Sequence, residues 1–393
     1  MTIVFWLSVA LVAYTYVGYP LILWVFTRAA RRALPRAEML SSVSIVIAAR
    51  NEADKIRQKI ANTLDLDYPP RLREVIVASD ASDDGTDDIV REYSSRGVSL
   101  VRASHRGGKE YVQALAILVA KGDILVFTDV ATNLEPVALR RLVRHFSDPT
   151  IGAVSTEDCL VDADGNPTGE GLYVRYEMWV RRLESRFYSL VGLSGSCFGI
   201  RRDLCRTWPS TLASDFLAAL HAARRNYRAV AEPSARARFV AVASPHAEAR
   251  RKVRTFLRGI TVLVANRDLL NPIKHGRFAF QFASHKLLRF LAPFLLLIAL
   301  ITSAVLRSDT PFNILFQAQL AVYLLGGAGA LVPRLQRAPF VRVASYFSMV
   351  QGTMLIAWGK YLLGRQQVVW EPSKRHGFTP AARPSNTRKS SAR

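Results

Sequence analysis

Hydrophobic residues gather at the two ends of this chain of 393 residues, whereas its middle alternates short apolar runs with polar turns. The first stretch, Ile3–Phe26, holds 24 residues without a charge. A helix of that length can cross a hydrocarbon core of about 30 Å. Three further apolar stretches follow near the other end, at Phe290–Leu306, Thr310–Pro333 and Val343–Gly359. We therefore predict an N-terminal transmembrane helix within residues 1–27 and about three more helices in a C-terminal membrane region.

The charges that flank these stretches predict the side of the membrane on which each part lies. Four arginines between positions 28 and 36 follow the first stretch, and such clusters stay in the cytoplasm, so we expect the N-terminus outside. Four crossings would return residues 364–393 to the outside, although this tail holds seven Lys or Arg and one Glu. Either one short segment within 284–363 is interfacial or re-entrant, which we favour, or the charge rule is broken. The tail has the composition of a disordered segment.

The middle of the chain, residues 41–275, is expected to be a cytoplasmic α/β domain with a mainly parallel sheet, because short β-branched runs alternate with helical patterns. Strands are expected at Val43–Ile47, Glu74–Ala78, Asp123–Thr128 and Ile151–Ser155, and helices at Ala53–Leu66, Gly85–Arg96, Lys109–Ala120 and Glu135–His145. Ligands of such sheets bind at the carboxyl ends of the strands, where Glu52, Asp80, Asp83 and Asp129 fall. No GxGxxG or Walker A motif is present, which argues against a dinucleotide or P-loop site.

Composition adds two constraints. The formal net charge of +22 fits cytoplasmic retention of basic residues and binding of phosphate-bearing substrates, and without a zinc-finger or RNP-type pattern it does not indicate nucleic acid. Three cysteines, Cys159, Cys197 and Cys205, have no spacing typical of disulfides or of a structural metal site. We expect reduced thiols in a cytoplasmic domain.

Seven strings follow one another in a fixed order along the chain. They are VSIVIAARNE from Val43, VIVASDASDDGT from Val75, RGGKE from Arg106, VFTDVATNLEP from Val126, GLSGSCFGIRRDL from Gly192, SDF from Ser214 and SHKLLRFLAP from Ser284. In order and spacing these strings resemble family 2 glycosyltransferases with the GT-A fold, in particular the membrane-integrated branch with cellulose, hyaluronan and poly-N-acetylglucosamine synthases.

The resemblance implies a nucleotide-sugar site at the strand ends. Glu52 and Asp80 would face the nucleotide base, with Asp80 accepting from a uracil N–H, and Asp83 would lie beside them. The alternative for both is a turn residue; we favour contact with the base for Asp80, and for Asp83 the two interpretations are balanced. Lys109 starts a helix after two glycines, a position suited to a diphosphate, although a surface lysine is the plainer interpretation.

The resemblance also implies a divalent cation, Mg²⁺ or Mn²⁺, held by Asp129 as the first acid of the DxD motif. Ala131 stands where the second acid belongs, which puts dependence on a metal in question.

Asp215 aligns with the catalytic base of the family, although an Asp at a helix start can simply be a cap. Arg251 and Arg254 lie where the family carries its QxxRW motif and would bind the pyrophosphate, the alternative being a basic helix face on the lipid surface. Only the arginine of that motif is retained, at Arg254.

Leu172–Val191 shows apolar residues at helical spacing, which predicts either core packing beside the acceptor site or an interfacial helix. The DADG sequence at Asp162–Gly165 predicts a turn.

Together these features predict an inverting glycosyltransferase in the cell membrane, with several spans and a cytoplasmic catalytic domain. It would move a sugar from a nucleotide donor, preferably a UDP-sugar, to a glycan or a lipid-linked acceptor, and processive polysaccharide synthesis is one hypothesis. Single addition to a glycolipid is an alternative. A catalytically degenerate scaffold or partner subunit is another, supported by Ala131, Ser214 and Thr255, which depart from the motifs.

Overall fold

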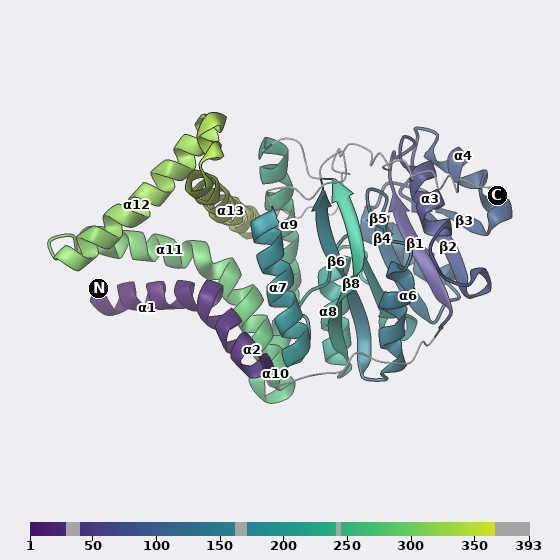
Figure 1. Ribbon diagram of the computed structural model, residues 1–393, viewed down its shortest axis with the longest axis horizontal. Coiled ribbons are helices and arrows are strands. Elements are labelled where there is room, and N and C mark those ends of the chain that lie inside the picture. Colours follow the sequence, from purple (N-terminus) through teal and green to yellow (C-terminus); the bar gives the residue numbers. More distant parts are fainter. Residues whose placement is uncertain (29–39, 162–170, 241–244, 366–393) are drawn as a thin grey trace, which may run out of the picture.

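The computed structural model describes residues 1–28, 40–161, 171–240 and 245–365. A twisted sheet covered by helices forms one part, and a group of long helices that holds the N-terminus forms the other (Figure 1). The predicted turn at Asp162–Gly165 and nearly all of the predicted disordered tail lie outside the described residues.

Eight strands form a single sheet in the order β3-β2-β1-β4-β7-β6-β8-β5. The strands are β1 (Val43–Ala49), β2 (Arg73–Ser79), β3 (Val98–Arg102), β4 (Ile124–Asp129), β5 (Asn133–Leu134), β6 (Ile151–Val161), β7 (Cys197–Arg201) and β8 (Arg228–Val240). The first four strands pair in parallel, as do β6 and β8, whereas β7 runs antiparallel to β4 and β6, and β5 runs antiparallel to β8. The prediction of a mainly parallel sheet is confirmed.

Helices cover both faces of this sheet. α3 (Ile56–Leu64), α4 (Thr86–Arg91) and α6 (Ala138–Val143) contribute to the core on one face, and α5 (Lys109–Val119) and α8 (Ser214–Arg224) to the core on the other. Strand β1 feeds both cores, because its alternate side chains point to opposite faces. The helices are shorter than predicted; the expected helix Gly85–Arg96 ends at Arg91 and continues as a 3₁₀ turn.

The long helices begin with α1 (Thr2–Ala13), a π turn (Tyr14–Gly18) and α2 (Tyr19–Arg28). They continue with α10 (Pro272–Phe282), a second π turn (Ala283–Leu287), α11 (Leu288–Val305), α12 (Thr310–Leu331) and α13 (Pro339–Leu362). Four continuous stretches are long and apolar enough to cross a membrane: Thr2–Arg28, Pro272–Val305, Thr310–Leu331 and Pro339–Leu362. The stretch Pro272–Val305 is 34 residues long and starts well before Phe290, where the predicted helix began. The helix can include His285 and Arg289 because these side chains bond to Glu184 and Glu177 inside the protein.

α7 (Gly171–Phe187) and α9 (Pro245–Ala265) stand between the sheet and the long helices (Figure 1). A hydrophobic cluster joins Leu257 and Ile260 of α9 to Phe290 of α11 and Met354 of α13. The two parts of the molecule therefore share a core, which holds the sheet edge at a fixed place beside the long helices.

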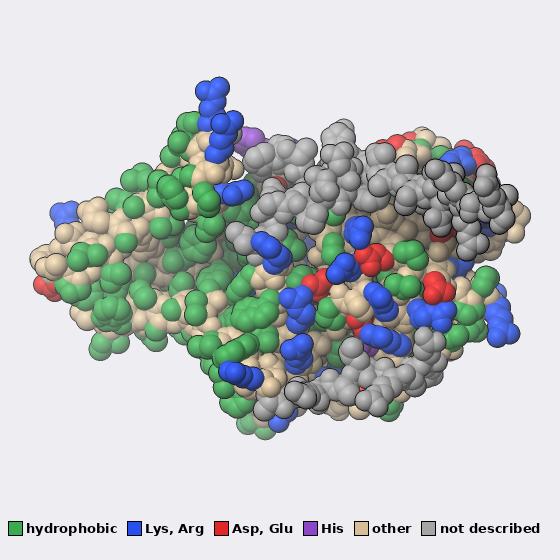
Figure 2. Space-filling view, in the orientation of Figure 1, with side chains coloured by type: hydrophobic (Ala, Val, Ile, Leu, Met, Phe, Trp, Pro, Cys, Tyr) green, Lys and Arg blue, Asp and Glu red, His purple; other side chains and the backbone are tan. Residues whose placement is uncertain are grey.

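The surface changes character along the molecule. Hydrophobic side chains cover much of the part formed by α1, α11 and α12, and Lys and Arg gather over α7, β6 and β8 (Figure 2). An apolar surface next to a basic one is the pattern expected where a membrane core meets its anionic cytoplasmic face.

Candidate active site

A cavity of about 490 Å³ lies where the sheet meets the long helices. Glu52, Lys109 and Asp129 line it at the carboxyl ends of the parallel strands, which we call the strand end. At the other end, the membrane-proximal end, Phe290 and Tyr346 come from α11 and α13. The cavity thus connects the expected donor site with helices that are apolar enough to lie in a membrane.

Lys109 and Asp129 meet at the strand end. Gly108 precedes α5 with φ of +92°, a conformation that favours glycine, and it turns the chain so that Lys109 begins the helix. The Lys109 ammonium lies 2.5 Å from Asp129 Oδ1 and donates to the carbonyl oxygen of Gly195 at 3.3 Å. Burial acts to lower the pKa of Lys109, but Asp129 and Glu110 outweigh it and the pKa is raised. Lys109 is therefore a fixed positive charge in the cavity.

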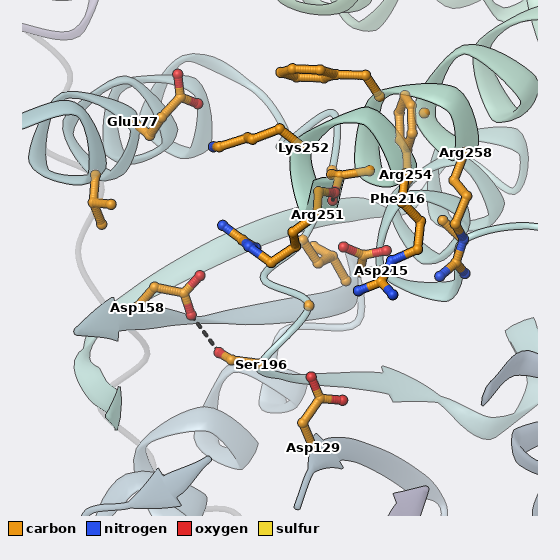
Figure 3. Close-up of a pocket in the computed structure, with 18 of the residues that line it drawn as sticks. Asp129, Asp158, Glu177, Ser196, Asp215, Phe216, Arg251, Lys252, Arg254 and Arg258 are labelled. Atoms are coloured by element: carbon orange, nitrogen blue, oxygen red, sulfur yellow. Dashed lines mark hydrogen bonds between the residues drawn. The ribbon is translucent and has the colours of Figure 1, made fainter. Parts of the chain in front are cut away.

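Asp215 lies close to this pair. A methyl group placed on Gly195 would lie 3.0 Å from Asp215 Oδ2, so the carboxylate packs against the residue whose carbonyl receives Lys109. Asp215 lies between Asp129 and the arginines of α9 (Figure 3). The N-cap of α8 is Ala213, and Asp215 belongs to the first turn of the helix, so Asp215 is not its capping residue. Asp215 lines the cavity together with Lys109 and Asp129.

Asp80 occupies a different position from these three. It is fully buried, and its carboxylate accepts from the backbone N–H of Gly107 at 2.7 Å and of Gly108 at 3.0 Å. It is not among the residues that line the cavity. In this arrangement Asp80 holds the loop that places Lys109, and its contact with a base stays a prediction.

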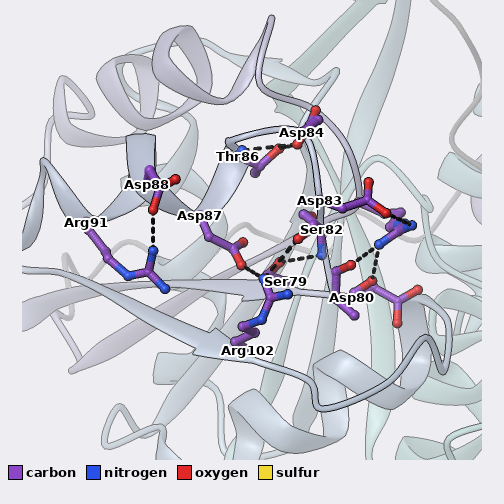
Figure 4. A network of polar contacts seen from close by, with 12 residues as sticks. Ser79, Asp80, Ser82, Asp83, Asp84, Thr86, Asp87, Asp88, Arg91 and Arg102 are labelled. Atoms are coloured by element: carbon purple, nitrogen blue, oxygen red, sulfur yellow. Dashed lines mark hydrogen bonds and ion pairs between the residues drawn. The ribbon is translucent and has the colours of Figure 1, made fainter.

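Asp83 and Glu52 flank the same strand ends. Asp83 is exposed, outside the cavity lining, and its pKa is lowered by the hydrogen bond from Asn51 at 2.7 Å and by Arg50 at 3.1 Å (Figure 4). Glu52 is buried, lines the cavity and pairs with Lys55 at 3.0 Å. Burial raises the pKa of Glu52.

Three arginines of α9 face the cavity at helical spacing: Arg251, Arg254 and Arg258. Arg251 holds Glu248 through two hydrogen bonds of 2.7 Å, and Arg258 pairs with Glu110 of α5. The sequence interpretation named the first two and missed Arg258, although its spacing of four residues from Arg254 was a usable signal.

Two further groups of the lining were also missed. Asp158 on β6 accepts from the hydroxyls of Ser194 and Ser196 (Figure 3). Arg181 on α7 donates to the carbonyl oxygen of Gly192 at 2.8 Å. No local signal marks these pairs, because their members are far apart in the chain and the predicted strand stopped at Ser155.

A buried lysine supports the segment that follows β4. Lys59 donates to Thr128 Oγ1 at 2.9 Å and to the carbonyl oxygen of Thr132 at 2.6 Å. Burial lowers the pKa of Lys59 to about 8. Lys59 therefore fixes the chain on both sides of Asp129.

Buried polar side chains join α7 to the long helices. Glu184 accepts from the Tyr19 hydroxyl at 2.6 Å and contacts His285 Nδ1 at 2.7 Å, and Glu177 pairs with Arg289. α7 thus serves as a packing helix between the sheet and α2, the first of the two roles expected for Leu172–Val191.

The described residues provide little protein ligation for a metal. They contain no group of three or more His, Cys, Asp or Glu side chains suited to hold one. Asp129 lines the cavity as expected, and Ala131 beside it carries no ligand. Cys159, Cys197 and Cys205 are free thiols, and burial raises the pKa of each.

Residues 44–208 match the profile of Glycosyl transferase family 2. The chain contains a family 2 glycosyl transferase domain. A β-monoglucosyldiacylglycerol synthase of Trichormus variabilis is 26% identical over 187 residues, 45% of this chain and 40% of that protein. A hyaluronan synthase of Streptococcus pyogenes is 32% identical over 122 residues, 29% of this chain and 28% of that protein. The matches thus span well under half the length of these relatives.

A solved structure is similar over nearly the whole chain. The mannosyltransferase PcManGT from Pyrobaculum calidifontis, determined with GDP-Man and Mn²⁺, superposes with a TM-score of 0.71 at 22% identity. The superposition covers 92% of this chain and 100% of that one. The predicted GT-A fold is therefore confirmed.

Proposed function

We propose that the protein is an inverting glycosyltransferase that moves a sugar from a nucleoside diphosphate to a hydroxyl group of a membrane lipid or lipid-linked glycan. The observation that supports this most directly is the meeting of Lys109, Asp129 and Asp215 around Gly195. The family 2 domain and the lipid- and polysaccharide-synthesising relatives point the same way.

The reaction needs one base and one stabilised leaving group. The acceptor oxygen attacks the anomeric carbon from the face opposite the diphosphate and forms the new C–O bond. The bond between the anomeric carbon and the β-phosphate oxygen breaks at the same time. Asp215 takes the proton of the acceptor hydroxyl. Lys109 and Arg254 stabilise the charge that develops on the departing nucleoside diphosphate. The products are the glycoside, the nucleoside diphosphate and one proton.

We propose that UDP is the nucleotide and that a divalent cation assists its departure. One carboxylate suffices for Mg²⁺ or Mn²⁺ when phosphate and water oxygens complete the ligand set, so Asp129 fits the role despite Ala131. Four acids, Glu52, Glu110, Asp129 and Asp215, line this part of the cavity beside Lys109 and the arginines of α9, so a divalent cation would add to the positive charge that binds a diphosphate.

The membrane arrangement that we propose has three crossings. α13 packs against α9 and also contacts α11, where the Trp358 indole N–H donates to the carbonyl oxygen of Phe290 at 2.9 Å. We propose that α13 lies at the membrane surface, because α9 belongs to the layer between the sheet and the long helices (Figure 1). Three crossings from an outside N-terminus leave residues 364–393 in the cytoplasm, which removes the conflict with their basic charge. The sheet domain then lies in the cytoplasm.

A second candidate is a scaffold that has kept the fold and lost catalysis, favoured by Ala131, Ser214 and Thr255 in motif positions. Purified protein in detergent should be screened with a panel of UDP-sugars for UDP release, with and without Mn²⁺. We expect release with at least one donor, and its loss by roughly 10²- to 10⁴-fold in Asp215→Asn while UDP still binds. UDP binding without turnover of any donor would instead identify the scaffold.

A further inference from the structure

The membrane-proximal end of the cavity holds positively charged side chains that have no role in the proposed sugar transfer. Arg289 pairs with Glu177, and Glu248 takes two hydrogen bonds from Arg251 and lies 3.8 Å from Lys252. Arg181 and Lys286 line the same end, and neither forms an ion pair with a described carboxylate. Glu177 and Glu184 act on Lys286, and Glu157 on Arg181, only through longer-range electrostatics, so neither cation has a described carboxylate in direct contact, as Arg289 and Arg251 have.

Lys286 lies in the candidate span Pro272–Val305, directly before its apolar part, and its neighbours His285 and Arg289 are paired with Glu184 and Glu177. Its ammonium lies 5.0 Å from the centre of the Phe216 ring, next to Asp215 in the chain. A methyl group placed on Gly192 would lie 3.3 Å from the ammonium nitrogen. A charge in such a helix is costly and marks a functional site unless it is paired.

Arg181 reaches the same glycine from α7. It donates to the carbonyl oxygen of Gly192 at 2.8 Å and to Ser155 Oγ at 3.1 Å. The next residue, Leu193, donates its backbone N–H to the carbonyl oxygen of Asp215 at 3.1 Å. The two cations thus meet at a wall of the cavity that is bonded to the catalytic segment.

We propose that the acceptor is a phosphate-bearing membrane lipid, whose phosphate is held by Arg181 and Lys286 and whose hydroxyl faces Asp215. The proposal rests on the proposed function. A planar guanidinium and an ammonium together suit phosphate oxygens. Phe290 and Tyr346 line the same end from the long helices, so the molecule that enters there is a lipid. A neutral acceptor such as diacylglycerol would give the two cations no anionic oxygen in direct contact.

The test uses the full-length protein with the UDP-sugar that it turns over. Sugar transfer is measured in phosphatidylcholine vesicles that contain added phosphatidylglycerol, phosphatidylinositol or diacylglycerol, and also with soluble glycerol phosphate. We expect transfer to at least one of the two anionic lipids, and little transfer to diacylglycerol or to glycerol phosphate. Lys286→Gln should lower kcat/KM for that lipid by roughly ten- to a hundredfold, and Lys286→Arg should restore most of it.

Lys274→Gln is the matched control, because Lys274 is an exposed lysine on the same continuous helix and is outside the cavity lining. It should leave transfer unchanged. UDP binding by each variant checks that the protein is folded. Preferred transfer to diacylglycerol, donor hydrolysis without transfer to any anionic lipid, or equal activity of Lys286→Gln and wild type would each overturn the lipid-phosphate proposal. If no UDP-sugar is turned over at all, the proposed function itself fails.

Discussion

The two ends of the cavity differ in how the chain builds them. At the strand end, the three residues Glu52, Lys109 and Asp129 lie within about 80 positions of one another in the sequence. Glu52 follows β1, Lys109 begins α5 and Asp129 ends β4. At the membrane-proximal end, Arg181, Lys286 and Tyr346 come from three helices that are separated by much longer stretches. Parallel strands bring their carboxyl ends to one edge, so the first end follows from local pattern. The membrane-proximal end forms only when α7, α11 and α13 pack against one another and bring these distant residues together.

Their charges differ as well. Around Asp129 and Asp215 the carboxylates are matched by Lys109 and the arginines of α9, whereas Arg181 and Lys286 have no described carboxylate in direct contact at the other end. A diphosphate with its metal suits a site that holds both signs of charge, and a bare anion suits cations without a direct partner. The difference suggests that the two substrates are recognised by different arrangements of charge, which the following changes test.

The largest effect is expected at the strand end. Asp129→Asn keeps the shape of the side chain but removes the charge that pairs with Lys109 and serves the metal. UDP release, with or without acceptor, should fall by about 10²- to 10³-fold. Asp203→Asn, which alters an exposed ion pair with Arg206, is the control and should change little. Unchanged turnover in Asp129→Asn would remove the metal from the proposal.

A change outside both ends should affect stability and leave the two recognition sites alone. Burial acts to raise the pKa of Glu232, but hydrogen bonds from His145, Ser234 and Arg144 lower it from 4.5 to about 2. This group therefore stabilises the fold fully above pH 4.5, and its contribution is lost as pH falls towards 2.

Glu232→Gln should accordingly cost about 2–3 kcal/mol near neutral pH. The difference in thermal midpoint between variant and wild type, measured in detergent, should shrink as the pH falls towards 2. A difference that stays constant over this pH range would contradict the assignment.

Outside the cavity, where α7 packs on the long helices, Tyr19→Phe removes the buried hydroxyl that donates to Glu184 at 2.6 Å. Loss of this bond should destabilise the protein by about 1–3 kcal/mol, measured as a lower thermal midpoint. Tyr14→Phe, whose hydroxyl bonds Ser284 in a less buried place, should cost less. Donor KM should stay constant in both; a rise in donor KM would show that this packing contact is coupled to the strand end.

The smallest effect is expected from restoring the missing acid. Ala131→Asp adds a second carboxylate to the cavity lining beside Asp129. We expect a severalfold decrease in the Mn²⁺ concentration at half-maximal activity, because another oxygen ligand binds the ion. Activity that appears only in this variant would support the scaffold candidate.

Particular residues show where sequence interpretation stopped. β7 and β8 were not predicted, because β7 contains Gly199 and β8 contains Pro233 and alternating arginines, which weaken the strand pattern. The sequence did not reveal that Asp80 accepts from backbone N–H groups of a loop 27 residues later, and its contact with a base stays a prediction. Asp158 was missed because its partners are distant in the chain, whereas Arg258 could have been found from its helical spacing to Arg254.

The sequence by itself predicted the long apolar stretches and strands at β1, β2, β4 and the start of β6, because local periodicity encodes them. A strand end indicated Asp129, a Gly-rich helix start indicated Lys109, and the resemblance to family 2 motifs indicated Asp215. Tertiary structure alone decided that these three groups share one cavity and that Arg181 and Lys286 converge on Gly192. The physical reason is that contacts between distant segments depend on how the helices and the sheet pack. The same packing decides which charged side chains lie close enough to form ion pairs.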